Sequence, residues 1–117
     1  MAIDLREMQA LDLWRRTVVT TVAGDAPDLS GRQMAVLLTV FLTAPPHTVR
    51  GLAQILKVSK PAITRALDRL GALDLVRRRT DEADRRSVLV QRTVRGSVFL
   101  HEFGETITAA ARAVDRG

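Results

Sequence analysis

Twelve consecutive residues, 77–88, read RRRTDEADRRSV and concentrate the charged chemistry of this chain. Three arginines are followed by three acids within four positions and then by two more arginines. Guanidinium groups bind phosphates and carboxylates through paired hydrogen bonds, and a neighbouring carboxylate can hold a guanidinium in place. The stretch therefore indicates either an anion-binding element or, more simply, a solvated surface loop.

The positive charge of the chain is gathered around this stretch. The net charge is +5 and the sequence pI is about 11.2. Residues 50–95 contain 12 Lys and Arg residues against 5 Asp and Glu residues, whereas the remaining residues contain 6 against 8. A basic middle on a nearly neutral frame predicts one face that binds a polyanion.

The composition argues against several other functions. A chain without cysteine has no disulfide, thiol redox centre or thiolate zinc site. His47 and His101 lack the three or four converging ligands that a metal needs, and no nucleophile–base pair or glycine-rich phosphate loop is visible. We therefore expect no enzyme, no cofactor and no metal. No stretch resembles a membrane span or a signal peptide, so we expect a cytoplasmic protein without a membrane partner.

Hydrophobic spacing predicts a single domain, residues 1–117, that is mostly α-helical with a small β-hairpin (an α+β class). Apolar side chains recur every three or four residues in five segments. The predicted helices span residues 4–22, 31–43, 49–56, 59–73 and 94–115. Two short runs, residues 75–79 and 87–91, are typical of strands on either side of a charged tip.

Capping residues explain where four of these helices begin. Ser30, Thr48, Ser59 and Thr93 each precede a helical segment, where a hydroxyl can accept a hydrogen bond from a free N–H group of the first turn. Pro61 suits the first turn of segment 59–73, because the missing N–H of proline costs little there.

The first and last helices, residues 4–22 and 94–115, each carry an apolar stripe. The two stripes are Met8, Leu11, Trp14, Val18 and Val22, and Phe99, Phe103, Ile107, Ala110 and Val114. A small chain with only 3% aromatic residues has a limited core, and oligomerisation commonly adds stability. We therefore expect these helices to form a dimer interface or core rather than an effector pocket.

The helices at residues 49–56 and 59–73 form a candidate helix-turn-helix, joined at Lys57 and Val58. Such a pair alone is a weak signal, because many helical cores contain one. The β-hairpin that follows strengthens it, since the two together make a winged helix. When the apolar positions of the second helix face the core, the outward positions are Lys60, Pro61, Thr64, Arg65 and Asp68.

A winged helix of this kind predicts contact with both grooves of double-stranded DNA. The outward face of residues 59–73 suits the major groove, and a wing tip with Arg85 and Arg86 can reach the minor groove, whose negative potential attracts guanidinium groups. Asp84 can brace one arginine, and Asp81 can bond to its own turn. The candidate DNA-binding residues are Ser59, Lys60, Pro61, Ala62, Thr64, Arg65, Arg69, Lys57, Arg78, Asp84, Arg85 and Arg86.

Residues 29–103 resemble the MarR-type winged-helix transcription regulators, with a DNA-binding core at residues 29–92. The most specific motifs are SKPAITRALDRL at residues 59–70 and DEADRR at residues 81–86. The resemblance implies a homodimer that binds a pseudo-palindromic operator, usually as a repressor, with Arg86 in the minor groove and Asp84 bracing it. It also implies that a small anionic, often aromatic effector releases the DNA in many members.

The sequence departs from the family pattern in four places. Asp74 replaces a glycine, Gly51 replaces an acid, Arg92 replaces a leucine, and the sequence ends soon after Val114, where relatives continue into another dimerising helix. We expect the turn at Asp74 to persist, because aspartate tolerates left-handed backbone. Gly51 leaves Thr48 without a capping-box partner. The short end bears on dimer geometry and on the effector pocket more than on DNA contact.

A sequence-specific regulator is the function that these features favour. The alternative is a winged-helix protein-interaction module that uses the same basic hairpin to hold an acidic protein, because a fold does not by itself decide function. Tight, salt-sensitive DNA binding that resists competitor DNA would separate the two.

Overall fold

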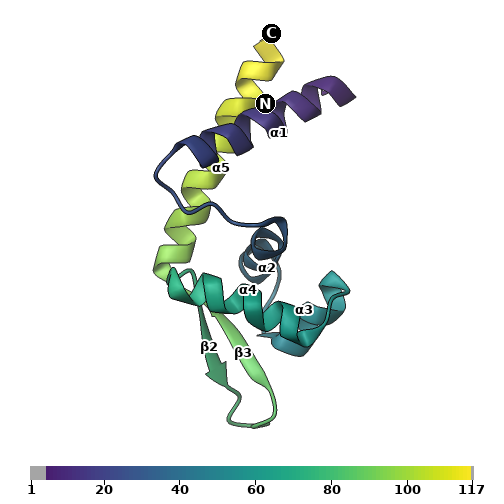
Figure 1. Cartoon of the computed structure of the whole chain (residues 1–117), viewed down its shortest axis with the longest axis vertical. Coiled ribbons are helices and arrows are strands. Elements are labelled where there is room, and N and C mark those ends of the chain that lie inside the picture. Colours follow the sequence, from purple (N-terminus) through teal and green to yellow (C-terminus); the bar gives the residue numbers. More distant parts are fainter. Residues whose placement is uncertain (1–4, 117) are drawn as a thin grey trace. The chain divides into compact units, whose positions relative to one another are not determined.

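The computed structural model describes residues 5–116, which form five α-helices and a three-stranded antiparallel sheet (Figure 1). The elements are α1 (Glu7–Ala23), α2 (Gly31–Leu42), β1 (His47–Thr48), α3 (Val49–Leu56), α4 (Lys60–Ala72), β2 (Val76–Thr80), β3 (Val88–Arg92) and α5 (Val94–Arg116). The predicted fold class is confirmed. The predicted helix start at Asp4 lies outside the described residues.

Contacts within the chain cluster into two compact units. One unit is residues 29–98, and the other joins the N-terminal segment up to residue 28 with the C-terminal segment from residue 99. The first unit contains the whole helix-turn-helix and the hairpin, so it includes the predicted core at residues 29–92. The single-domain organisation of residues 1–117 stays a prediction.

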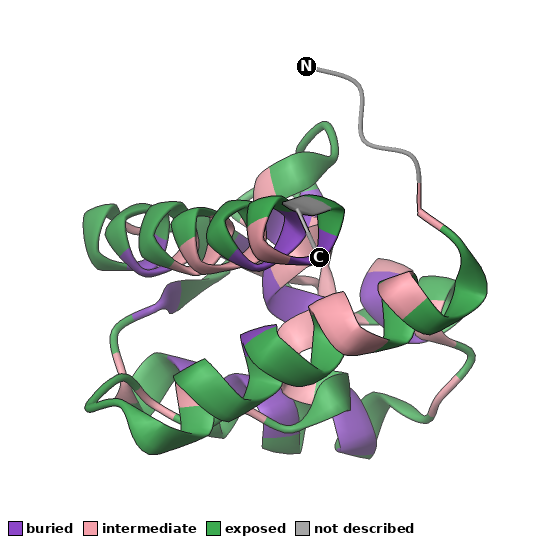
Figure 2. Cartoon of the chain, turned by 90° about the horizontal axis from the view of Figure 1, so that it is seen from above, coloured by how far each residue is buried: buried purple, intermediate pink, exposed green. Residues whose placement is uncertain are grey.

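The core of the unit 29–98 is built from the inward faces of α2, α3 and α4. The most deeply buried side chains on these helices are Val36, Leu37, Val40, Leu52, Ile63, Leu67 and Leu70. They recur at spacings of three and four on α2 and α4, so each of these helices turns one face to the core. Figure 2, which colours the ribbon by burial, shows buried and exposed residues alternating along the helices. The aliphatic packing that holds α4 leaves its opposite face free.

The four predicted helix caps are present. The hydroxyl oxygens of Ser30, Thr48, Ser59 and Thr93 accept hydrogen bonds from backbone N–H groups three residues later, at 3.1, 2.9, 3.2 and 2.9 Å. The cap on α3 therefore forms although Gly51 offers no side chain to complete a capping box. Asp74 has φ 58°, so the expected left-handed turn after α4 is confirmed, and Lys57 ends α3 in the same conformation with φ 57°.

The sheet has the strand order β1-β3-β2. The hairpin pairs Val76 with Arg92 and Thr80 with Val88. Both of its strands begin and end one residue later in the chain than the sequence predicted. The two-residue strand β1 was not predicted, because a segment of that length has no periodicity to detect. It pairs with β3 at Leu89 and Val90 and so ties the start of α3 to the base of the wing.

Arg92, which departs from the family pattern, bonds to the end of α2. Its Nε and Nη2 atoms donate hydrogen bonds to the carbonyl oxygens of Val40 and Thr43, both at 2.9 Å. Its guanidinium carbon lies 6.0 Å from the centre of the Phe41 ring. The last carbonyls of a helix have no partner within the helix, so Arg92 satisfies two acceptors and fastens β3 to α2.

Replacing Arg92 with leucine, the usual family residue, is expected to lower the free energy of unfolding by about 1–2 kcal/mol. Leucine cannot donate to the two carbonyls, and partial exposure of the site keeps the loss modest. Urea unfolding of the full chain measures the change. Arg32→Leu, at an exposed position of α2, is the control, and equal midpoints for the two variants would contradict the structural role of Arg92.

The second unit brings α1 against α5. The rings of Trp14 and Phe103 meet edge to face with centroids 6.4 Å apart, and Phe99 stacks on Phe103 at 6.5 Å. Part of the apolar stripe of α5 therefore packs inside the chain. Apart from the contact of Trp14, the stripe of α1 stays largely exposed in the described residues, with Met8 75% and Leu11 64% exposed.

Two arginines of α1 share one carboxylate. The Nε atoms of Arg15 and Arg16 lie 2.9 and 3.0 Å from the carboxylate oxygens of Asp12. The hydrogen bond from Arg16 has the largest effect and the one from Arg15 the next, and together they hold the pKa of Asp12 below its usual value.

Across residues 5–116, no helix combines the length and the apolar character that crossing a membrane requires.

Candidate nucleic-acid interface

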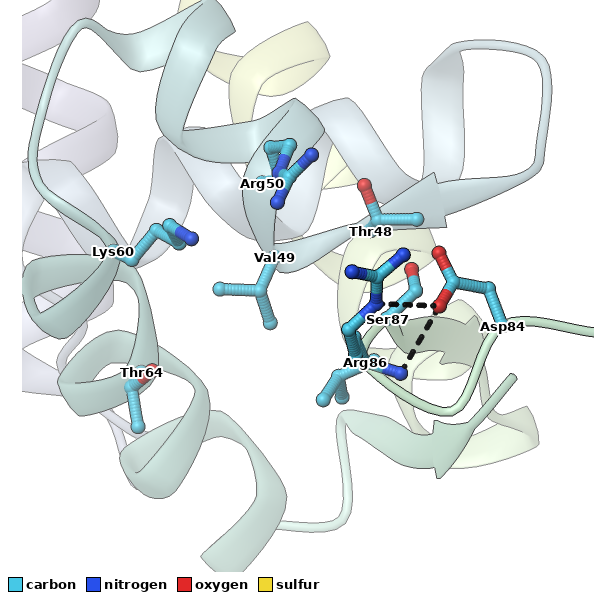
Figure 3. Close-up of a pocket in the computed structure, with 9 residues that line it drawn as sticks. Thr48, Val49, Arg50, Lys60, Thr64, Asp84, Arg86 and Ser87 are labelled. Carbon is cyan, nitrogen blue, oxygen red and sulfur yellow. Dashed lines mark hydrogen bonds and ion pairs between the residues drawn. The ribbon is translucent and has the colours of Figure 1, made fainter. Parts of the chain in front are cut away.

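A cleft of about 360 Å³ lies between the start of α3, the exposed face of α4 and the hairpin tip. We call it the basic cleft, and its lining residues are Thr48, Val49, Arg50, Lys60, Thr64, Asp84, Arg86, Ser87 and Val88. Figure 3 shows Lys60 and Thr64 on α4 at one side, the wing residues at the other, and Arg50 from α3 between them. Three cationic side chains and one carboxylate converge there.

The outward face of α4 matches the sequence prediction. Lys60, Pro61, Thr64, Arg65 and Asp68 are all exposed, and their neighbours on the other face fill the core. Lys60 and Thr64 are one helical turn apart and so lie on the same face of α4. That face lines the basic cleft. The other two predicted arginines of this helix, Arg65 and Arg69, are exposed but do not line the cleft.

The first turn of α4 offers less to an anion than the sequence suggested. The side chain of Ala62 is 6% exposed, and its N–H donates to both the hydroxyl and the carbonyl oxygen of Ser59. Ala62 is therefore removed from the set of candidate contacts, because both its methyl group and its N–H are already used. The exposed Ser59 keeps its hydroxyl hydrogen as a donor.

The wing tip holds Arg86 beside a carboxylate. Oδ1 of Asp84 accepts a hydrogen bond from the N–H of Arg86 at 3.1 Å, and Nε of Arg86 lies 3.5 Å from the same oxygen. The Arg86 side chain is 93% exposed, so this pair adds little stability but orients the guanidinium. Asp81 accepts from the N–H of Ala83 at 3.0 Å, as predicted for a turn acid.

Arg78 forms an ion pair with another residue of the same chain. Its Nη2 lies 2.8 Å from Oδ1 of Asp68, which joins β2 to the exposed face of α4. Arg78 shares a row of the sheet with Val90 and His47, whereas Arg77 and Arg79 alternate onto the other face. Arg78 therefore orients the wing relative to α4. Lys57 and Arg85, also predicted contacts, are exposed outside the basic cleft.

Sequence reasoning missed the contribution of α3 to this site. Thr48, Val49 and Arg50 line the basic cleft, but the sequence indicated only a helix cap and a member of the basic segment there. The available signal was the position of Arg50 in the first turn of the helix that precedes α4. Only the fold brings that turn opposite Arg86.

A metal site is not visible in the described part of the chain. Residues 5–116 contain no group of three or more His, Asp or Glu side chains that could hold an ion. Nε2 of His101 lies 3.6 Å from Oε1 of Glu105 along α5. The lining of the basic cleft presents hydrogen-bond donors and positive charge beside one carboxylate, that of Asp84.

Comparison with known proteins places the chain beside transcription regulators. The sequence profile of the MarR family matches residues 28–87. No curated protein matches the sequence. Among solved structures, the transcriptional regulator Tm0710 from Thermotoga maritima is 21% identical with a TM-score of 0.70, covering 92% of this chain and 70% of that chain.

Two further solved structures share the fold at similarly low identity. Wild-type MarR from E. coli in its apo form is 24% identical with a TM-score of 0.72, covering 93% of this chain and 78% of that chain. A mutant of MepR from S. aureus, bound to an oligodeoxyribonucleotide, is 17% identical with a TM-score of 0.78, covering 92% of this chain and 76% of that chain. At these identities the likeness concerns the fold.

Proposed function

Because the chain belongs to the MarR family of transcriptional regulators, we propose that it binds a specific double-stranded DNA operator through the basic cleft and the surfaces beside it. Residues 59–73 would occupy the major groove and residues 79–87 the adjacent minor groove. The observation that carries this proposal is that the exposed face of α4 and the wing arginine Arg86 line the same cleft. A buried face of α4, or a wing directed away from it, would have removed its basis.

The side chains divide into three roles by their chemistry. Arg50 and Lys60 carry positive charge at the cleft wall and suit phosphate oxygens. Thr64 and Arg65 are exposed on α4 and suit base edges, since an arginine can bond both acceptors of a guanine. Arg86, held by Asp84, suits a narrow minor groove. Arg78 acts by orienting the wing through Asp68.

A homodimer completes the proposal. The stripe of α1, in which Met8, Leu11 and Trp14 are exposed, suits the apolar surface of a second copy of the chain, and two-fold symmetry suits a pseudo-palindromic operator. The two recognition helices would then lie roughly 34 Å apart, one turn of DNA. Repression of transcription, and release of DNA by a small anionic or aromatic effector, are further parts of the proposal that the family membership supports.

Selection of genomic fragments by the purified full chain tests specific binding. The bound fragments are sequenced, and the most enriched one is titrated by fluorescence polarisation with and without competitor DNA at two salt concentrations. We expect a common pseudo-palindromic motif and binding that survives competitor but weakens steeply with salt. If all fragments were recovered equally and competitor DNA displaced the labelled fragment, the protein-interaction module would be favoured instead.

Arg65→Ala is expected to cost about 1–3 kcal/mol of operator affinity per protomer and to relax the base preference at one position of each half-site. The reason is that an exposed arginine on the outward face of α4 can read one base pair by two hydrogen bonds. Repeating the fragment selection with the variant measures both effects. An unchanged motif would exclude Arg65 from base recognition.

Arg50→Ala is expected to weaken binding to specific and competitor DNA alike. A phosphate contact carries no sequence information, so the ratio of the two affinities should stay constant while the slope of log K against log salt falls by about 1 per protomer. Titrations at four salt concentrations measure the slope. The exposed Arg32, which does not line the basic cleft, provides the control Arg32→Ala, whose slope should match the wild type.

A further inference from the structure

The base of the wing is fastened to the end of α2 more by hydrogen bonds than by close packing. A hollow of about 240 Å³ lies at this base, and its lining comes from the end of α2, residues 45–47 and β3. Dense packing holds an element through many small van der Waals contacts, and side chains that face a hollow lose part of them. The orientation of the wing therefore depends strongly on the polar side chains beside the hollow, which are His47, Gln91 and Arg92.

The carbonyl oxygen of Thr43 is the point to which two strands of the sheet are tied. Nη2 of Arg92, on β3, donates a hydrogen bond to it at 2.9 Å, and Nε2 of His47, on β1, lies 3.2 Å from it. A carbonyl oxygen only accepts hydrogen bonds, so Nε2 of His47 carries the hydrogen in that contact. Nε of Arg92 donates to the carbonyl oxygen of Val40 at 2.9 Å. Since β1 and β3 also pair with each other, these bonds hold both strands to the end of α2.

Arg92 is the firmer of two ties between the wing and the helices. Its planar guanidinium bonds two carbonyl oxygens at once, so it fixes the direction of β3 as well as its position. The second tie is the ion pair of Arg78 with Asp68, in which both side chains are exposed and therefore screened by water. The bond from Nε of Arg92 is partly buried and is screened less.

A small tilt at the base of the wing moves its tip by a large distance. Arg86 precedes Arg92 by six residues, which is about 20 Å of extended chain. A tilt of about 10° at Arg92 would move Arg86 by roughly 3 Å, which is the whole length of a hydrogen bond. The minor-groove contact assigned to Arg86 therefore requires a base that is held in one orientation.

We propose that Arg92 is a positioning residue for the wing, which fixes the orientation of the hairpin relative to α4 and so brings Arg86 to the minor groove. The DNA part of this inference rests on the proposed function, whereas the orientation of the wing is a property of the chain without DNA. Arg92 does not line the basic cleft, so it acts through Arg86. Leucine, the usual family residue at this position, has no hydrogen to donate, so this tie comes from the residues of this chain.

Distances between two spin labels test the orientation of the wing without DNA. Because the chain has no cysteine, Ala83→Cys at the wing tip and Ala72→Cys at the end of α4 place labels at two exposed alanines. Labelled chain is diluted with unlabelled chain, so that double electron–electron resonance measures distances within one chain. We expect one narrow distribution when Arg92 is present. Arg92→Leu should broaden it or shift it by about 3 Å or more.

Two further variants show whether the hydrogen bonds of Arg92 cause this change. Arg92→Lys can still donate to a carbonyl oxygen but lacks the planar fork, so its distribution should lie between the other two. Arg77→Leu is the matched control, because Arg77 is exposed on the opposite face of the same hairpin, and it should leave the distribution unchanged. Equal distributions for Arg92→Leu and Arg77→Leu would overturn the proposal.

A double-mutant cycle on the selected operator tests whether Arg92 acts through Arg86. Arg92→Leu should raise the Kd about fivefold or more in the otherwise unchanged chain, but less than about twofold beside Arg86→Ala, because a misplaced wing then has no contact left to lose. A role in folding alone would raise the Kd by the same factor in both backgrounds, and that result would refute the positioning role. If the selection yields no operator, the proposed function fails, and the label distances alone decide whether Arg92 orients the wing.

Discussion

Arg86→Ala raises the Kd for the selected operator about 30- to 1,000-fold in the expected outcome. A dimer loses two minor-groove contacts, and each lost contact costs roughly 1–2 kcal/mol. The side chain is 93% exposed and held only by Asp84, so its removal leaves the core untouched. Fluorescence polarisation measures the Kd, and the unfolding midpoint of the variant should equal that of the wild type.

Two companion variants separate the minor-groove role from general charge. Arg86→Lys keeps the charge but loses the planar fork, so we expect an intermediate Kd. Arg32→Ala removes one positive charge per protomer at an exposed position outside the basic cleft and should change the Kd less than threefold. If Arg86→Ala bound the operator as tightly as Arg32→Ala, the assignment of the wing to the minor groove would be wrong.

Gly96→Ala is expected to destabilise the unit 29–98 by about 2–3 kcal/mol, at the upper end of the usual cost of overpacking. A Cβ atom at Gly96 would lie 2.5 Å from Cζ of Phe41 and still closer to the carbonyl oxygen of Leu75. Neither neighbour can yield easily, because one is backbone and the other is the ring beside Arg92. Thermal unfolding followed by circular dichroism should show Tm lowered by roughly 10–20 °C.

Gly71→Ala is the matched control for this prediction. Gly71 lies in α4 of the same unit, and a Cβ atom there would have nothing within 4 Å. Alanine is the better helix former, so this variant should gain about 0.5–1 kcal/mol. A Tm for Gly96→Ala at or above that of the wild type would show that α5 can begin without close approach to Leu75 and Phe41.

The order and type of the helices followed from local information in the sequence. Periodic apolar residues and hydroxyl caps act within one or two helical turns, so the start of α3 was predicted to the residue and that of α4 to within one residue. The hairpin was displaced by one residue, because strand ends depend on pairing across the turn rather than on the strand itself. The left-handed turn at Asp74 was expected because the resemblance places a glycine there and aspartate tolerates left-handed backbone.

The composition of the candidate site was predicted only in part. Lys60, Thr64, Asp84 and Arg86 were expected from their motifs, and they do meet in the basic cleft. Arg50 was not expected there, because its place depends on how α3 turns toward the wing. Ala62 was named as a candidate DNA contact, although the packing of α4 buries it.

Residue types and their spacing were sufficient to predict the helices, the caps and the charged wing, and the motifs at residues 59–70 and 81–86 carried the resemblance to the family. Tertiary structure alone decided which groups each charged side chain meets. Arg78 is bound to Asp68 and Arg92 to the end of α2, whereas Arg50 and Arg86 face one cleft. The physical reason is that caps and periodicity depend on neighbours a few residues away, whereas the pairing of an arginine depends on partners as far as 52 positions along the chain.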